Sequence, residues 1–142
     1  MKSFAKSYVV DANAILDYVQ DGPGAATVER LLRDAFREHS SLLISVVNLG
    51  EVFYILWKNR GEQTARRTID DLGLLPLQII PVDLAQALKA GEIKVNHNIP
   101  YADSIAAALA FTHNATIVTS DRDFEKLGRR IPVLWLTSPR QR

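Results

Sequence analysis

The stretch Tyr8-Val9-Val10-Asp11-Ala12-Asn13-Ala14-Ile15-Leu16 decides how the rest of the chain is interpreted. Its pattern is typical of a short buried strand, a carboxylate at the end of that strand, and the start of a helix. Asp11 is the only charged residue between Ser7 and Leu16. A lone carboxylate in apolar surroundings is costly unless something compensates its charge. Asp11 is therefore either a helix cap or part of a site that supplies the missing positive charge.

Strands and helices alternate along the chain. Short apolar runs predict strands at Tyr8–Val10, Leu42–Ile44, Leu77–Val82, Ala115–Val118 and Val133–Leu136. Periodic or capped segments predict helices over 12–19, 25–38, 46–58, 62–72, 84–93 and 101–112, with a short one over 121–127 and a possible break at Gly91. Continuous apolar strands separated by helices are typical of a buried, mainly parallel sheet with helices on both faces. We therefore expect one domain over 1–142, a three-layer α/β/α sandwich, with a frayed tail at 138–142.

Composition narrows the class of protein further. Of 142 residues, 47% are hydrophobic and 23% are charged, which is ordinary for a globular domain. The chain has no cysteine, which excludes disulfides and thiolate metal sites. It shows no signal peptide or membrane-spanning segment, so we expect a cytoplasmic protein. The formal net charge of +1 gives no global basic field for nucleic acid, and the local basic clusters are read first as solvated helix faces.

Four of the 16 acidic residues stand apart from other charges. Asp11 follows three apolar or aromatic residues, and Asp121 ends the segment Asn-Ala-Thr-Ile-Val-Thr-Ser. Glu51 is the only charge between Ser40 and Trp57, and Asp103 is the only charge over 98–112. Each of the four can be explained alone as a cap, a dipole partner or half of an ion pair. Taken singly, these structural explanations are the more frequent ones.

The expected positions of the four carboxylates make the structural explanation weaker for the set. Asp11 and Asp121 follow parallel strands, at the sheet edge where open α/β folds bind ligands. Asp103 lies in the first turn of its helix, and Glu51 is expected to project from an apolar helix face toward the sheet. Four carboxylates at one edge repel each other, and none has a basic neighbour in its own segment. All-oxygen ligands favour a hard cation such as Mg²⁺ or Mn²⁺.

Four motifs in this order resemble the PIN-domain nucleases, and most closely the VapC-type toxins of toxin–antitoxin pairs. They are Val-Val-Asp11-Ala-Asn13-Ala, Asn-Leu-Gly-Glu51, Pro-Tyr-Ala-Asp103-Ser and Thr119-Ser-Asp121-Arg-Asp123-Phe. Each motif alone is weak, but the ordered set covers essentially the whole chain. The resemblance implies a PIN-like sheet of five strands in the order 3-2-1-4-5, which makes the first and fourth strands neighbours.

The resemblance also implies roles for particular residues. Asp11, Glu51, Asp103 and Asp121 correspond to the catalytic acidic quartet around the metal, and Asp11 and Asp103 are favoured most as direct ligands. Asn13 and Thr119 resemble polar residues that orient the ligands or a bound water. Asp123 matches a position that is often acidic but less regular. The implied activity is Mg²⁺-dependent hydrolysis of RNA, leaving a 5′-phosphate and a 3′-hydroxyl. The implied partners are an RNA substrate, a cognate antitoxin and a second copy of the chain.

Two other functions remain open from the sequence. Asp11 with Thr119 and Ser120 is similar to the dehalogenase-like phosphatases, in which an aspartate is the nucleophile. That class usually has a second aspartate two residues later, where this chain has Asn13. A catalytically silent metal-binding or RNA-binding module is the other possibility. Trapping a phospho-aspartate supports the first, and RNA binding without turnover in any divalent metal supports the second.

Overall fold

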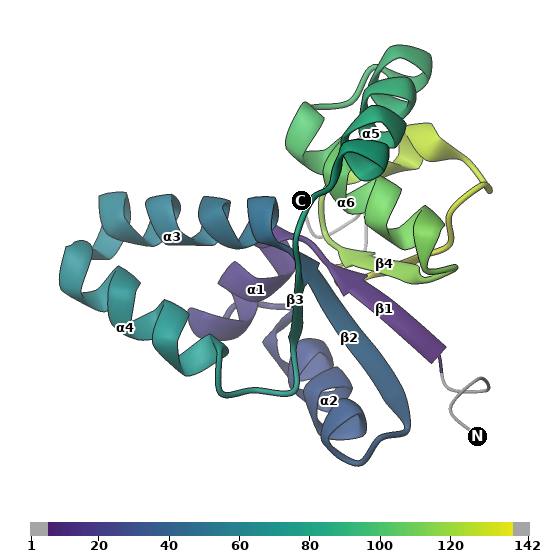
Figure 1. The fold of residues 1–142 in the computed structure, drawn as a ribbon. Helices are drawn as coiled ribbons and strands as arrows, with labels where there is room; N and C mark the ends of the chain where they lie inside the picture. Colours follow the sequence, from purple (N-terminus) through teal and green to yellow (C-terminus); the bar gives the residue numbers. More distant parts are fainter. Residues whose placement is uncertain (1–5, 138–142) are drawn as a thin grey trace.

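The computed structural model describes residues 6–137 and contains one five-stranded sheet (Figure 1). Its strands lie in the order β3-β2-β1-β4-β5, and every neighbouring pair is parallel. The strands are β1 (Lys6–Val10), β2 (Ser40–Ser45), β3 (Gln78–Ile80), β4 (Thr116–Thr119) and β5 (Val133–Trp135). The predicted fold class and strand order are therefore confirmed.

The helices occupy the segments between the strands, as predicted. They are α1 (Ala12–Val19), α2 (Ala25–Phe36), α3 (Val46–Arg60), α4 (Glu62–Leu72), α5 (Leu84–His97) and α6 (Tyr101–Thr112), followed by the 3-10 helix η2 (Arg122–Leu127). The possible break at Gly91 does not occur, because α5 is continuous through that residue. The predicted tail at 138–142 lies outside the described residues. Within residues 6–137 no helix is both long and apolar enough to span a bilayer.

The sheet separates two apolar cores, because successive strand residues point to opposite faces. Val9 and Ile117 belong to the core under α5 and α6. Val10 and Val118, one residue further along the same two strands, belong to the core under α1, α2, α3 and α4. Figure 1 shows these two groups of helices on either side of the sheet. The central strands β1, β2 and β4 carry buried residues on both faces, which explains their continuous apolar sequences.

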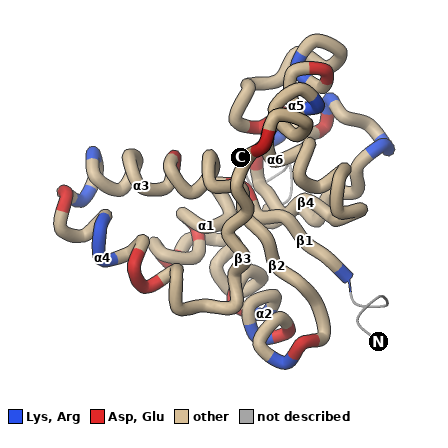
Figure 2. The backbone as a smooth tube through the Cα atoms, in the orientation of Figure 1, with Lys and Arg blue, Asp and Glu red and all other residues tan. Residues whose placement is uncertain are grey.

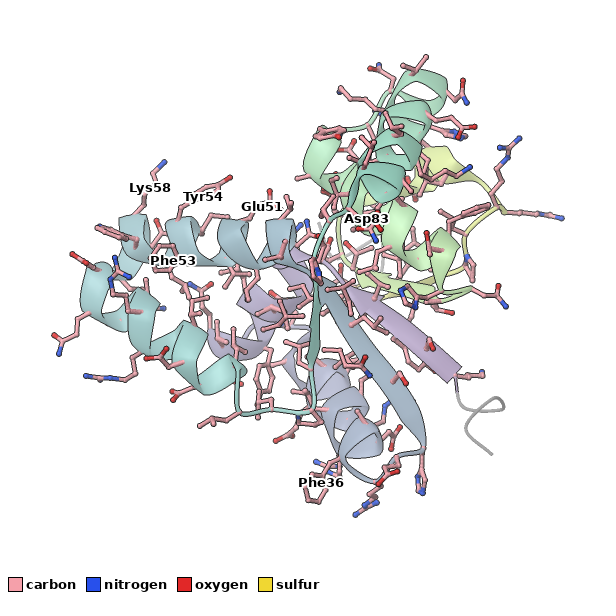
Figure 3. The ribbon with its side chains drawn as sticks, viewed as in Figure 1. Phe36, Glu51, Phe53, Tyr54, Lys58 and Asp83 are labelled. Carbon is pink, nitrogen blue, oxygen red and sulfur yellow. The ribbon has the colours of Figure 1, made fainter. Side chains whose placement is uncertain are left out.

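The face of α3 that carries Glu51 differs from our expectation. Glu51 does not project toward the sheet, since α3 buries Asn48, Leu49, Val52 and Leu56 instead. Figure 3 shows Glu51 and Tyr54 pointing from the same side of α3, and the Tyr54 side chain is 52% exposed. Because α3 is apolar almost all round, apolar neighbours of Glu51 could not identify which face packs on the sheet.

Candidate metal centre

Asp11 lies immediately after β1 and caps the N-terminus of α1. The backbone N–H of Ala14 donates a hydrogen bond of 2.9 Å to Oδ1 of Asp11. Because Val10 lies opposite Val118 in the parallel pair β1–β4, the residues that follow them, Asp11 and Thr119, are also neighbours. The Thr119 hydroxyl donates to Oδ2 of Asp11, and both side chains are buried. The orientation of the Asp11 carboxylate is therefore fixed through both oxygens.

Thr119 also holds the segment that follows β4. Its Oγ1 accepts a hydrogen bond of 2.9 Å from the backbone N–H of Asp121. Asp121 in turn caps η2, since its Oδ1 accepts from the backbone N–H of Asp123 at 2.9 Å. One buried hydroxyl thus connects the Asp11 carboxylate to the backbone that carries Asp121 and Asp123.

Asp103 enters the same region from the first turn of α6. That helix is buried continuously from Ser104 to Ala110, so its N-terminus is held rigidly at the edge of the sheet. Oδ2 of Asp103 is itself buried and accepts no hydrogen bond from any residue in the range 6–137. Carboxylate oxygens of Asp103, Asp121 and Asp123 all lie within 4.8 Å of one another.

Asn48 is a residue of this region whose role the sequence analysis missed. Its Nδ2 donates to Oε1 of Glu51 at 3.0 Å and to the carbonyl oxygen of Ala102 at 3.2 Å. The side chain is buried, so it ties α3 to the start of α6 next to Asp103. The available signal was a lone amide one helical turn before Glu51 in an otherwise apolar segment.

Burial and mutual repulsion raise the pKa values of two of these carboxyls. Burial raises the pKa of Asp11 to about 7, partly opposed by hydrogen bonds from Thr119 and Ala14 and reinforced by the charges of Asp121 and Glu51. Burial, followed by repulsion from Asp121, raises the pKa of Asp103 to about 8. A protonated Asp103 could also donate a hydrogen bond to the Asp121 carboxylate, which raises the pKa of Asp103 further, whereas the ionised Asp103 has no proton to donate.

The four predicted carboxylates lie close enough for their charges to interact, since Asp11, Glu51 and Asp121 each raise the pKa of Asp103. The three oxygens closest to one another come from a different set that includes Asp123 in place of Asp11 and Glu51. Asn13 is exposed on α1, and its side chain forms no hydrogen bond with any described residue. Its orienting role stays a prediction, as do the roles of the other site residues.

The donor set fits a divalent cation. A buried carboxylate oxygen without a donor is expensive, and a cation that accepts it as a ligand removes this cost. Asp103, Asp121 and Asp123 could each offer one oxygen to such an ion. Oxygen ligands without cysteine or histidine favour a hard cation over a soft one.

Replacing Asn48 with alanine is expected to lower the free energy of unfolding by about 1–2 kcal/mol and to weaken Mn²⁺ binding by about 10-fold, because Glu51 and α6 lose their shared donor. Titration calorimetry with Mn²⁺ and urea unfolding measure the two effects. Asn59→Ala, at an exposed position of the same helix, is the matched control. Equal effects of the two variants would contradict a positioning role for Asn48.

Comparisons with known proteins agree with this fold. The model of the PIN domain family matches residues 8–130. Similar solved structures, each 19% identical in sequence, include VapBC2 from Rickettsia felis bound to a promoter DNA fragment (TM-score 0.73, covering 90% of this chain and 97% of that chain). DNA-bound VapBC from Salmonella typhimurium is also similar (TM-score 0.73, covering 93% of this chain and 99% of that chain). So is the Sarcin-Ricin loop cleaving toxin VapC20 from Mycobacterium tuberculosis (TM-score 0.69, covering 85% of this chain and 95% of that chain).

No curated protein matches the chain. The family model nevertheless spans most of the sequence, from β1 through η2, and includes all the carboxylates described above. The chain belongs to the PIN domain family.

Proposed function

We propose that this protein is a Mg²⁺-dependent endoribonuclease that acts as the toxin of a toxin–antitoxin pair. The observation that carries the proposal is the buried, unpartnered oxygen of Asp103 beside the carboxylates of Asp121 and Asp123. Such a cluster repels itself unless a cation is bound. Membership of the PIN family and similarity to VapC20, a toxin that cleaves the Sarcin-Ricin loop, support RNA as the substrate. An RNA substrate in turn suits a cytoplasmic protein.

In the proposed site the protein side chains hold the cation and orient one another. Asp103, Asp121 and Asp123 would hold the cation, with Asp11 and Glu51 completing its negative surroundings. When bound, Mg²⁺ supplies a Lewis acid for the scissile phosphate and makes hydroxide available at neutral pH. Thr119 keeps Asp11 in one orientation and fixes the backbone of Asp121. Asn48 holds Glu51 against the start of α6.

The antitoxin and a second copy of the chain are the proposed protein partners. The similar VapBC structures are toxin–antitoxin complexes, which supports an antitoxin. An acidic site of this kind would accept an arginine from that partner, because guanidinium groups pair with carboxylates through two hydrogen bonds. Exposed apolar side chains on α5, among them Leu84, Leu88 and Val95, support a protein partner, because an apolar surface of this kind on the free chain is expected to be covered in a complex.

The geometry does not favour the phosphatase alternative. An aspartate nucleophile needs an oxygen that is open to the phosphorus of a substrate. Asp11 is only 3% exposed, and its two oxygens accept hydrogen bonds from Ala14 and Thr119. The side chain is therefore held as a structural or ligand carboxylate.

The direct test is incubation of the purified protein with a single-stranded RNA and with DNA of the same sequence. We expect cleavage of the RNA in Mg²⁺ or Mn²⁺, no cleavage in EDTA, and products with a 5′-phosphate and a 3′-hydroxyl. Mass spectrometry of the fragments identifies the ends. RNA that binds but stays intact in every divalent metal would support the silent module instead.

A further inference from the structure

A group of basic side chains lies along η2, the loop that follows it and the facing side of α5. We call Lys126, Arg129 and Arg130 the basic track; Lys89 and His97 of α5 lie beside it. Arg129 and Arg130 are exposed and form no ion pair or hydrogen bond with any residue between 6 and 137. Figure 2 shows their loop as a basic segment next to α5. Unpaired cations on one surface are free to meet an anionic ligand.

The basic track is continuous with the acidic cluster. Nζ of Lys126 lies 3.5 Å from Oδ1 of Asp123, a member of that cluster. The carbonyl oxygen of Lys126 is 3.1 Å from Nδ1 of His97. His97 and Arg130 then line one small cavity together with Lys89. A chain of contacts therefore leads from the candidate metal centre to Arg130.

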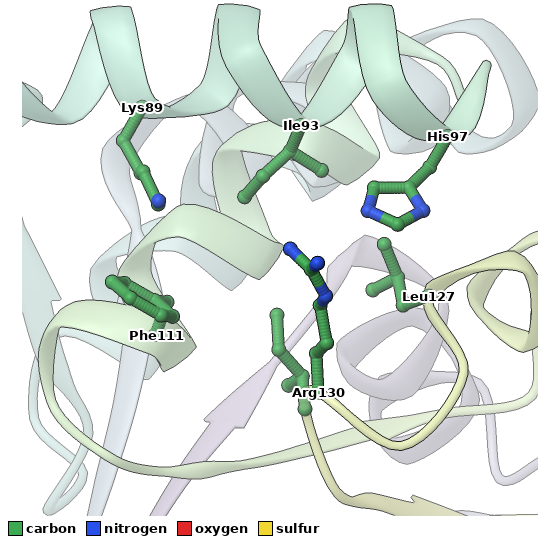
Figure 4. A pocket seen from close by; sticks show the side chains of 7 residues that line it. Lys89, Ile93, His97, Phe111, Leu127 and Arg130 are labelled. Atoms are coloured by element: carbon green, nitrogen blue, oxygen red, sulfur yellow. The ribbon is translucent and has the colours of Figure 1, made fainter.

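The cavity shows what kind of ligand this surface can take. Figure 4 shows Lys89, His97 and Arg130 around a hollow whose other walls are Ile93, Phe111, Leu127 and Ile131. Its volume of about 30 Å³ is that of roughly one water molecule, so a nucleobase cannot enter. Nζ of Lys89 lies 4.2 Å from the centre of the Phe111 ring and 3.1 Å from Oε1 of Glu92, so both Lys89 and one face of the ring are already engaged. The cavity offers no base pocket, and the unpaired charge of this surface within residues 6–137 is that of Arg129 and Arg130, which suits phosphate groups.

Other basic clusters lack this connection. Arg33 on α2 is 3.5 Å from Glu29, and Arg66 on α4 is 2.8 Å from Glu62. Arg66 is further engaged by the rings of Phe53 and Trp57, each about 5.4 Å from its guanidinium carbon. None of these residues contacts the acidic cluster through a described hydrogen bond or ion pair within residues 6–137.

We propose that the basic track binds the phosphate backbone of single-stranded RNA on one side of the cleavage site. This inference rests on the proposed nuclease function and deepens it, because it assigns a path to the substrate. Arg129 and Arg130 contact phosphates independently of sequence, while the acidic cluster would hold the cation that assists cleavage. Lys126 lies between the two regions, next to Asp123.

The test is the affinity of the full chain for a fluorescein-labelled single-stranded RNA in EDTA, where cleavage is prevented. The double variant Arg129→Gln/Arg130→Gln is expected to bind at least about 10-fold more weakly and to lower the salt slope of log K by about 1.4, since each phosphate contact on a single strand contributes about 0.7. The matched α2 control is Arg30→Gln/Arg37→Gln, in α2 and at the residue that follows it, which removes the same charge from exposed residues. Fluorescence anisotropy across a series of salt concentrations measures both quantities.

An equal loss in the α2 control would overturn the basic track, because net charge alone would then explain the effect. Unchanged RNA affinity in Arg129→Gln/Arg130→Gln would overturn it as well. A variant that keeps its RNA affinity and loses only the binding of an acidic protein partner counts as this outcome. Failure of the nuclease function looks different, because the unaltered protein then leaves RNA intact in every divalent metal, whether or not it binds RNA. Circular dichroism of both double variants checks that they are folded.

Discussion

Asp103→Asn is expected to reduce RNA cleavage by at least about 100-fold without unfolding the protein, since even residues that only support metal ligands typically contribute 10- to 100-fold. The amide keeps the shape of the side chain but removes one negative charge from the three-oxygen cluster. The fold is expected to persist because Oδ2 of Asp103 accepts no hydrogen bond within the described part of the chain. Single-turnover cleavage at several Mg²⁺ concentrations measures the loss, and a weakened site is expected to recover partly at high Mg²⁺.

Two further variants make this result specific. Asp70→Asn, at an exposed position of α4, changes the charge equally and is expected to leave the cleavage rate unchanged. Asp11→Asn is expected to lose activity too, but it also disturbs the fold locally. An amide at position 11 would donate to Thr119 Oγ1, which already accepts from the N–H of Asp121. Cleavage by Asp103→Asn at the unaltered rate would remove Asp103 from the proposed metal site.

The strands and helices could be predicted because their determinants are local. Continuous apolar strands, turn residues between helices and carboxylate caps are all readable from neighbouring residues. Parallel pairing then places the ends of β1 and β4 together, and Asp11 meets Thr119 by register alone. The strand order came from the family resemblance, since hydrophobic pattern does not decide which strands pair. The limits of elements differ by up to four residues, with the largest difference at the end of α5, since helix ends are the least well defined part of a helix.

The candidate site was predictable only in part. Lone charges in apolar segments identified Asp11, Glu51, Asp103 and Asp121. Asp123 has close charged neighbours, because Arg122 directly precedes it and Glu125 follows two residues later. The same criterion could therefore not select it. Its place in the cluster depends on the tight turn of η2, in which the Asp121 carboxylate accepts from the Asp123 N–H. Asn48 was missed because its partner Ala102 lies 54 residues away and offers only a backbone oxygen.

In EDTA, Asp103→Asn is expected to raise the melting temperature above pH 8 by several degrees, and Mg²⁺ is expected to remove this advantage. The physical reason is a raised pKa. In the folded protein the pKa of Asp103 is about 8, against 3.8 as the ordinary value. Between these values the folded chain holds a proton that the unfolded chain has released, so stability falls as pH rises and then levels off above pH 8. Asparagine does not titrate, so the difference between variant and unaltered protein should disappear near pH 4.

Mg²⁺ acts in the opposite direction on the unaltered protein. A cation that binds only the folded chain stabilises it by about 1.4 kcal/mol at a roughly tenfold excess over its dissociation constant. It also favours the ionised carboxylates, so its effect should grow with pH through the range in which Asp11 and then Asp103 lose their protons, about 7 and about 8. Asp103→Asn, with a weaker site, should gain less. Differential scanning fluorimetry at matched ionic strength separates the two cases: equal Mg²⁺ shifts in both proteins at pH 8.5 would mean that screening of surface charge, and not a bound ion, accounts for the stabilisation.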